Sequence, residues 1–309
     1  MPRYGLGLLY VALTLFVVSV HGSAWGHGVV GQRFFPESLS VEDPFPSDEA
    51  DFPAISFIKG PEGKERAVGL EYSKRLSPNL AFGFEVEHVS LSPADPTEPR
   101  QSGLNNPELF LKYAMLRDPE HEAIVSVILS VAPPWGDKDF TERNTTVAPG
   151  LIFGKGLGGL PDGLRYLKPI ALGGAVSLET PLGNITDPVD QTSTLNYGFI
   201  VEYSLPYLQS FVKDIGLSKP FSRMIPIVEF SMATPVNGPE HGATTAYVNP
   251  GLIWAGKYVQ FGAEALIPLN DRTGHNVGVL AVLHWYLDDL APNAFTWTPF
   301  HGTLGPTRK

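Results

Sequence analysis

The chain has 309 residues, a formal net charge of −10 and no cysteine, which excludes disulfides, zinc–thiolate sites and thiol nucleophiles. Charged residues make up only 17 % of it, and 32 glycines and 29 prolines indicate a chain rich in turns and strands. An acidic chain without basic clusters argues against nucleic acid as a partner.

The N-terminus carries a targeting signal. Arg3 precedes the apolar run LGLLYVALTLFVVSV, and small residues follow at 22–26. This order is typical of a secretory signal peptide, and we predict that residues 1–26 are removed on export. A membrane anchor is the alternative, but the run is shorter than the ~20 residues that a spanning helix needs.

Residues 27–51 form an acidic leader, with six acidic residues between Glu37 and Asp51. Its prolines and lack of periodicity predict an irregular segment, which we expect in the periplasm. After this leader, the sequence consists of segments of roughly ten residues separated by Gly, Pro, Asn or Asp. We therefore divide the rest of the chain into a β-domain at 52–289 and a C-terminal tail at 290–309.

Alternating apolar residues dominate the β-domain. In TSTLNYGFIVEYSL, for example, Leu195, Tyr197 and Phe199 share one face of an extended chain, and small or polar residues share the other. A period of two predicts β-strands. Such segments lie near 52–59, 66–76, 79–90, 104–116, 121–132, 145–156, 165–180, 192–205, 222–234, 244–255, 257–269 and 275–288.

Strand length separates the two architectures that use such strands. Soluble sandwich strands average ~5 to 6 residues, whereas membrane-spanning strands need ~9 to 11. Most of the predicted segments have ten residues or more, and their number is even, as in closed bacterial barrels. The sequence therefore predicts an all-β fold, a transmembrane antiparallel up-and-down barrel of about twelve strands.

The connections between strands alternate in length, with the longer ones mostly on the side we assign as extracellular. The exception is 206–221 on the other side, where apolar residues such as Tyr207, Phe211 and Ile215 recur at helical spacing. We predict one short periplasmic amphipathic helix there, with an irregular loop as the alternative.

A recurring stop marks the outer ends of alternate strands: VAPPWGD, ETPLGN, ATPVNG and LIPLND. Proline lacks the N–H that a sheet ladder needs, so it marks the point where pairing ends. Tryptophans concentrate at membrane interfaces, and we predict that Trp135, Trp254 and Trp285 belong to an interface girdle.

The stretch SVAPPWGD resembles the outer-membrane barrels of the meta-pathway phenol-degradation and transporter-like group. HGVVGQRFFPESLSVEDPF and EYSLPYLQSFVKDIGL resemble exported proteobacterial proteins of that general type. The resemblance implies a barrel, and with it a channel, but it carries no substrate and no catalytic motif. We expect a bacterial outer-membrane protein with both termini in the periplasm. Its expected partners are membrane lipid, lipopolysaccharide, the barrel-assembly machinery and an unidentified small solute. The tail beyond the last strand departs from barrels that end in an aromatic residue.

If the apolar faces meet lipid, the other faces define the lumen. Its predicted charged residues are Glu71, Glu85, Glu87, Glu108, Glu179, Glu202, Glu229, Glu264, Arg75, Lys112 and His284. Rings of carboxylates select for cations, which predicts a cation-favouring path. The alternative is a structural network in a narrow lumen, which the leader or loops could plug, because a barrel of twelve strands has a modest interior.

The sequence gives less support to two other functions, lipid hydrolysis and metal binding, than to a channel. His88 and Ser90 lie on one face at the outer end of a strand and fit an outer-leaflet lipid hydrolase, but no orienting acid or oxyanion hole accompanies them. The eight histidines are scattered without ligand spacing. We therefore predict no enzyme activity, no metal site and no cofactor.

Overall fold

The computed structural model describes residues 28–60, 63–138, 141, 143–183, 191–300 and 302–303. The predicted signal peptide lies outside these residues. The strands are β1 Val29–Val30, β2 Arg33–Phe34, β3 Glu49–Gly60, β4 Gly63–Ser77, β5 Leu80–Pro93, β6 Gln101–Leu104, β7 Glu108–Asp118, β8 Ala123–Ala132, β9 Thr145–Gly156, β10 Ile170–Leu182, β11 Thr194–Tyr203, β12 Met224–Pro235, β13 Thr245–Ala255, β14 Val259–Pro268, β15 Gly278–Tyr286, β16 Trp297–Thr298 and β17 Gly302–Thr303. The helical segments are η1 Asp162–Leu167, α2 Leu205–Tyr207, η2 Leu208–Val212, η3 Phe221–Arg223, α3 Leu287–Leu290 and α4 Pro292–Phe295.

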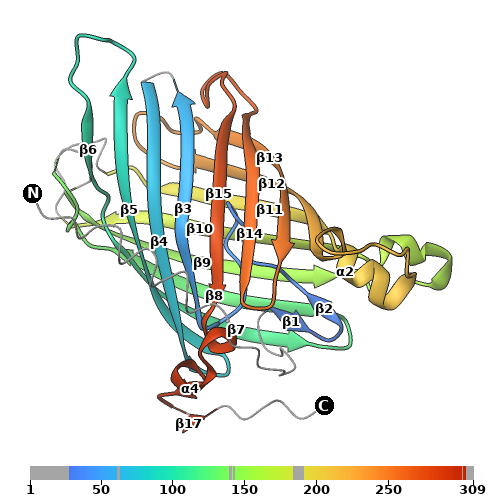
Figure 1. Ribbon diagram of the computed structural model, residues 1–309. Coiled ribbons are helices and arrows are strands. Elements are labelled where there is room, and N and C mark those ends of the chain that lie inside the picture. The colour runs from blue at the N-terminus through green and yellow to red at the C-terminus, as the bar shows by residue number, and fades with distance from the viewer. Residues whose placement is uncertain are drawn as a thin grey trace, which may run out of the picture.

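The strands from β3 to β15 close into one antiparallel barrel (Figure 1). Each strand pairs with its neighbour in sequence, and β15 closes the ring by pairing with β3. β6 and β7 share one position, because both pair with β5, with Pro107 in the gap between them. This gives the twelve positions that the alternating pattern predicts, and closure removes the unpaired edges that an open sheet would expose.

The barrel has two ends that differ in their connections. At one end, the terminal end, β3 begins and β15 ends, and tight turns such as the one at Pro78–Asn79 join strands. At the other, the loop end, lie the connections after β5, β8 and β12 (Figure 1), whereas the two longest connections, 157–169 and 204–223, lie at the terminal end. β8, β10, β12 and β14 all finish at this end, at or beside the predicted proline stops.

Alternation sets the two faces of the wall. Along β12, Ile225, Ile227 and Glu229 point inward and are buried, while Pro226 between them is exposed. The outer surface carries a band of exposed apolar side chains, which matches the lipid-facing surface of a membrane barrel. Its members include Phe57, Val68, Phe82, Leu111, Tyr113, Leu129, Leu151, Phe153, Leu172, Val176, Phe199, Val201, Leu252, Phe261 and Val279.

A helical segment lies at the terminal end, between β11 and β12. α2 and η2 together run from 205 to 212, where the apolar spacing predicts a helix. The segment is shorter than predicted, because Lys213 adopts an extended conformation and ends it. Among the described residues, no helix is long and apolar enough to cross a membrane.

The leader lies inside the barrel, as in the plugged-lumen alternative, which corrects our expectation of a periplasmic segment. Residues 28–48 enter at the terminal end, reach the middle of the lumen and return to begin β3. Two apolar clusters hold this segment. Phe35 and Phe45 pack with Ile124 on β8, and Phe34 and Leu39 pack against inward isoleucines of β11, β12 and β13. We call residues 28–48 the plug.

Candidate lumen and its plug

The apex of the plug is held by one carboxylate of the barrel wall. Glu229 on β12 accepts the backbone N–H groups of Leu39, Ser40 and Val41 at 2.9, 2.7 and 2.9 Å. Hydrogen bonds to an ionised acceptor are stronger than neutral ones. Glu229 was predicted as a lumen residue, and the structure shows that its oxygens are occupied by the plug.

Side chains on neighbouring strands also bind the plug. Asn249 lies opposite Glu229 across β12 and β13 and donates to the Ser40 hydroxyl at 3.1 Å. The same hydroxyl donates to Glu264 on β14. The returning limb is held by Lys112 on β7, which lies 2.7 Å from both Glu42 and Asp43.

A second anchor lies at the terminal end, around Arg33. Its guanidinium is fully buried, donates to Pro169 O at 2.9 Å and to Lys168 O, and lies 3.3 Å from Glu122. It also stacks on the Tyr207 ring, 3.9 Å from its centroid. This arrangement uses the planar fork and cation–π capacity that distinguish arginine from lysine.

Glu122 is the centre of this anchor. It has a φ of 49°, in the left-handed region that costs a residue with a side chain about 1 kcal/mol or more. The Tyr207 hydroxyl donates to it at 3.1 Å, and the Gly158 N–H does so at 3.1 Å. Burial and the neighbouring Glu122 charge raise the pKa of Tyr207 to about 12. The anchor thus joins the plug to the β7–β8 turn and to the helical segment.

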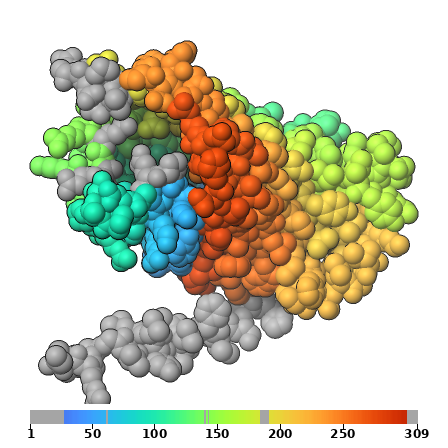
Figure 2. Space-filling model, turned by 90° about the horizontal axis from the view of Figure 1, so that it is seen from above, coloured from blue at the N-terminus to red at the C-terminus, as the bar shows by residue number. Residues whose placement is uncertain are grey.

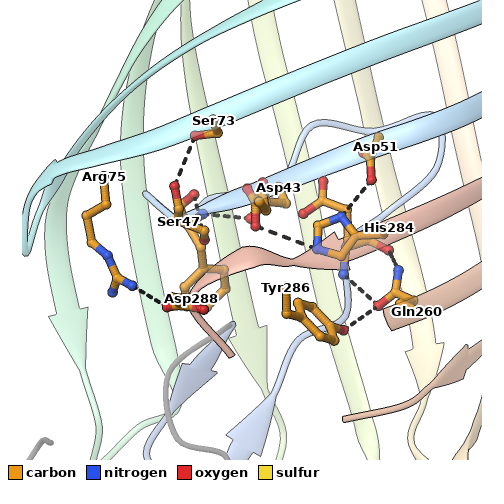
Figure 3. Close-up of polar contacts among 12 residues, drawn as sticks. Asp43, Ser47, Asp51, Ser73, Arg75, Gln260, His284, Tyr286 and Asp288 are labelled. Carbon is orange, nitrogen blue, oxygen red and sulfur yellow. Dashed lines mark hydrogen bonds and ion pairs between the residues drawn. The ribbon is translucent and has the colours of Figure 1, made fainter. Parts of the chain in front are cut away.

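The plug ends in a third anchor, at Asp48. This buried carboxylate contacts Lys74 and accepts the Arg75 backbone N–H at 3.2 Å and its Nε–H at 3.3 Å. Arg75 also donates to Asp288 of α3 at 2.6 Å (Figure 3). Arg75 was predicted for the ion path, and the structure places it in a network that joins the plug to the C-terminal segment.

A different part of the wall stays clear of these anchors. Asp51, Glu71, Glu85 and Glu108 are successive cross-strand partners on β3, β4, β5 and β7. Directly opposite like charges repel, so a structural sheet would avoid such a row. We call these four residues the acidic row. Glu85 is exposed although it points inward, which shows open space beside it.

The remaining predicted lumen residues also point inward. Glu87 accepts Asn105 Nδ2 at 2.7 Å, Glu179 accepts Asn196 Nδ2 at 3.3 Å, and Glu202 is buried near the plug. His284 is buried beside Asp51. An ion path through these residues stays a prediction, but their placement separates plug-binding groups from groups that face open space.

The open space lies towards the loop end. A cavity of about 440 Å³ is bounded by Ser40 and Glu42 of the plug and by inward residues of β10 to β13, such as Asn196 and Tyr247. Viewed from above Figure 1, the ends of the strands surround a hollow (Figure 2). A second cavity of about 700 Å³ lies near the loop end, between the β3–β4 hairpin and β5–β6. Its basic residues, such as Lys59 and Lys64, share the outward alternation of Phe57 and Val68, so it lies outside the lumen.

The other predicted positions are on the outer surface. Trp135 follows β8 at the loop end and is 71 % exposed, whereas Trp254 and Trp285 lie on the outward faces of β13 and β15 near the terminal end. Their membrane-interface role stays a prediction. His88 and Ser90 lie on β5, and no hydrogen bond joins their side chains in the described part of the chain.

No protein-family model matches the sequence, and no curated protein sequence matches it. Solved structures do match. The COG4313 outer membrane channel from Pseudomonas putida F1 is 11 % identical with a TM-score of 0.53, over 82 % of this chain and 99 % of that one. The NanC porin is 8 % identical with a TM-score of 0.47, over 76 % and 98 % of the two chains. The KdgM porin is 10 % identical with a TM-score of 0.45, over 77 % and 98 %. The chain therefore has the fold of bacterial outer-membrane β-barrels.

Proposed function

We propose that the protein is an outer-membrane channel for a small solute, with an acidic lumen that favours cations and a plug that narrows it. The observation that carries this proposal is the acidic row, four carboxylates paired directly across strands. Carboxylates that face a confined aqueous path attract cations and repel anions. The fold is shared with a structure named as an outer membrane channel, which supports the same class of function.

The orientation follows from the two ends. Outer-membrane barrels have tight periplasmic turns, and the tight turns at 78–79 and 256–258 lie at the terminal end, although the helical connections at 157–169 and 204–223 lie there too. We therefore place the terminal end, with the plug entrance and α3, in the periplasm, and the loop end outside the cell. On this proposal, a solute entering from outside passes both the acidic row and the apex of the plug.

A blocked barrel with a structural or binding role is the second candidate. The three plug anchors favour it, because they fill the terminal half of the lumen with buried contacts. The two candidates differ in conductance. A blocked barrel passes no ions, while a narrowed channel passes them through the gap beside the plug or when the plug moves.

The test is single-channel recording in planar bilayers with a salt gradient. We expect discrete conductance steps and a zero-current potential whose sign corresponds to cation preference. Complete absence of steps in folded protein, verified by heat-modifiable migration on a gel, would support the blocked barrel instead. Conductance with anion preference would contradict the role of the acidic row.

A further inference from the structure

A cluster of three potential metal ligands joins the plug to the barrel wall. It consists of Glu37 in the plug, Glu49 at the start of β3 and His284 on β15 (Figure 3 shows His284). One carboxylate oxygen from each glutamate and one ring nitrogen of His284 lie within 4.8 Å of one another. Glu49 and His284 are buried, so the cluster is shielded from the lumen.

His284 is oriented as a ligand. Its Nδ1 lies 2.6 Å from Asp51 Oδ1. An ionised carboxylate only accepts, so Nδ1 carries a proton, and in the neutral ring this leaves Nε2 with its lone pair. The side chain is 1 % exposed, and Nε2 makes no hydrogen bond with any described residue. Carboxylate–histidine pairs of this kind set the tautomer of metal-binding histidines.

Nε2 faces the Glu49 carboxylate. Its distance to Glu49 Oε2 is 3.7 Å, too long for a hydrogen bond. A buried nitrogen without a partner is costly, and so is a buried carboxylate without a compensating positive charge. An ion between these atoms would satisfy both sides at once.

The third ligand is positioned by its backbone. Gln260 on β14 lies opposite His284 and holds Glu37 on both sides, accepting its N–H at 3.2 Å and donating to its carbonyl at 2.7 Å. The Tyr286 hydroxyl donates to the Gln260 carbonyl oxygen at 3.1 Å (Figure 3). This support fixes the part of the plug that carries the Glu37 carboxylate.

The charge balance of the region also calls for a cation. Asp43 and Asp51 add two carboxylates beside Glu37 and Glu49. Lys112 is the nearby base, and it is already bound to Asp43 and Glu42. A neutral His284 contributes no positive charge, so the carboxylates of Glu37 and Glu49 stay unbalanced among these groups.

We infer that Glu37, Glu49 and His284 form a site for one divalent transition-metal ion, with Zn²⁺ as the best match, that fastens the plug to the wall. One imidazole and two carboxylates form a donor set that suits Zn²⁺ more than Mg²⁺ or Ca²⁺, which take oxygen ligands. Zinc bonds to such ligands are about 2.0–2.2 Å long, so the three atoms close around the ion by small side-chain rotations. Asp51 is a positioning residue that holds the His284 ring.

The test is metal binding to the folded, tag-free protein in detergent after removal of metal with EDTA. We expect one Zn²⁺ per chain by calorimetry and one Co²⁺ per chain by its visible absorption, with Zn²⁺ displacing Co²⁺ and equimolar Ca²⁺ leaving it in place. His284→Gln should abolish binding. Glu37→Gln should weaken it at least tenfold, and Asp51→Asn should weaken it about 10–100-fold, the range for partners of ligating histidines.

Two exposed positions provide matched controls. His241→Gln and Glu98→Gln make the same chemical changes outside the cluster and should leave binding unchanged. Less than stoichiometric binding by the unaltered protein, or equal binding by His284→Gln, would overturn the inference. If His284→Gln fails to fold, as judged by heat-modifiable migration, Glu37→Gln decides, since it lies outside the wall strands. Because binding is measured without conductance, this result is independent of the proposed channel function.

Discussion

Glu229 on the barrel wall accepts the backbone N–H of Val41 at 2.9 Å, in the middle of the lumen. This contact joins residues 188 positions apart and gives a lumen carboxylate a defined partner. It assigns Glu229 to holding the plug. The lumen charges therefore include residues that bind the plug and those of the acidic row, of which Asp51 also contacts His284.

Removing the Glu229 carboxylate should release the apex of the plug. Glu229→Ala loses three charge-assisted hydrogen bonds, a loss of roughly 3 kcal/mol or more in plug attachment. Limited proteolysis tracks how often a segment opens, so cleavage within residues 28–48 should become roughly 100-fold faster. Glu229→Gln keeps a neutral acceptor and should give a smaller increase. Glu179→Gln, which alters an inward glutamate bonded to Asn196, is the control and should change nothing.

Any substitution of Arg33 should weaken the attachment of the plug at the terminal end. Arg33→Ala leaves the largely buried Glu122 carboxylate without its positive partner, a change that costs about 3–5 kcal/mol. Arg33→Lys should restore little, because lysine offers no planar fork to reach both backbone carbonyls and the Tyr207 ring. The measurement is the temperature at which the plug becomes protease-sensitive. Equal transition temperatures for Arg33→Lys and the unaltered protein would contradict this account.

The acidic row should set ion preference. The triple variant Glu71→Gln, Glu85→Gln and Glu108→Gln should move the zero-current potential in a salt gradient at least halfway to zero, because the charges that attract cations are removed. A control with the same loss of charge uses Glu98, Glu120 and Glu240, all on exposed loops or turns. If the control variant shifts the zero-current potential equally, the shift reflects the net charge of the protein. The acidic row would then not set ion preference.

Tyr207 should make plug anchoring sensitive to alkaline pH. Burial first, and then the Glu122 charge, raise the pKa of Tyr207 from about 10 to about 12. The neutral form is favoured in the folded state, so its contribution to stability is complete below pH 10 and is lost as pH rises through 12. Between pH 9 and 12, the unaltered protein should lose more stability than Tyr207→Phe, measured by thermal unfolding. The exposed Tyr166 provides the control, and Tyr166→Phe should follow the unaltered protein.

The strands were predictable because each carries its own signal. Period two along β5 and β11 places Phe82 and Phe199 on the surface and Glu85 inside, and ladder pairing keeps this alternation around the ring. The proline stops were predictable for the same local reason. The break at Pro107, which divides one strand position into β6 and β7, was missed, because a proline near a strand entry does not reveal whether the ladder continues.

A leader that plugs the lumen was only an alternative at the level of sequence, because the contacts of the plug are far apart in sequence. The signal was nevertheless present. Ile225, Ile227 and Ile253 lie on faces that the alternation assigns to the lumen. Apolar side chains are unfavourable in an aqueous lumen unless another segment covers them. Phe34, Phe35 and Phe45 in the leader are the apolar groups that cover such residues. The metal-ligand cluster was missed for a related reason, since Glu37 and His284 meet only when the plug is in place.

The most direct test of a plug-controlled channel uses the absence of cysteine in the chain. Ser40→Cys and Asn249→Cys replace residues whose side chains are in contact, so oxidation should fasten the apex of the plug to the wall. In planar bilayers, we predict low, steady conductance when the pair is oxidised and larger, cation-selective steps after reduction, with each single-cysteine variant insensitive to both treatments. Identical conductance in the oxidised and reduced states, or none in either, would contradict the account.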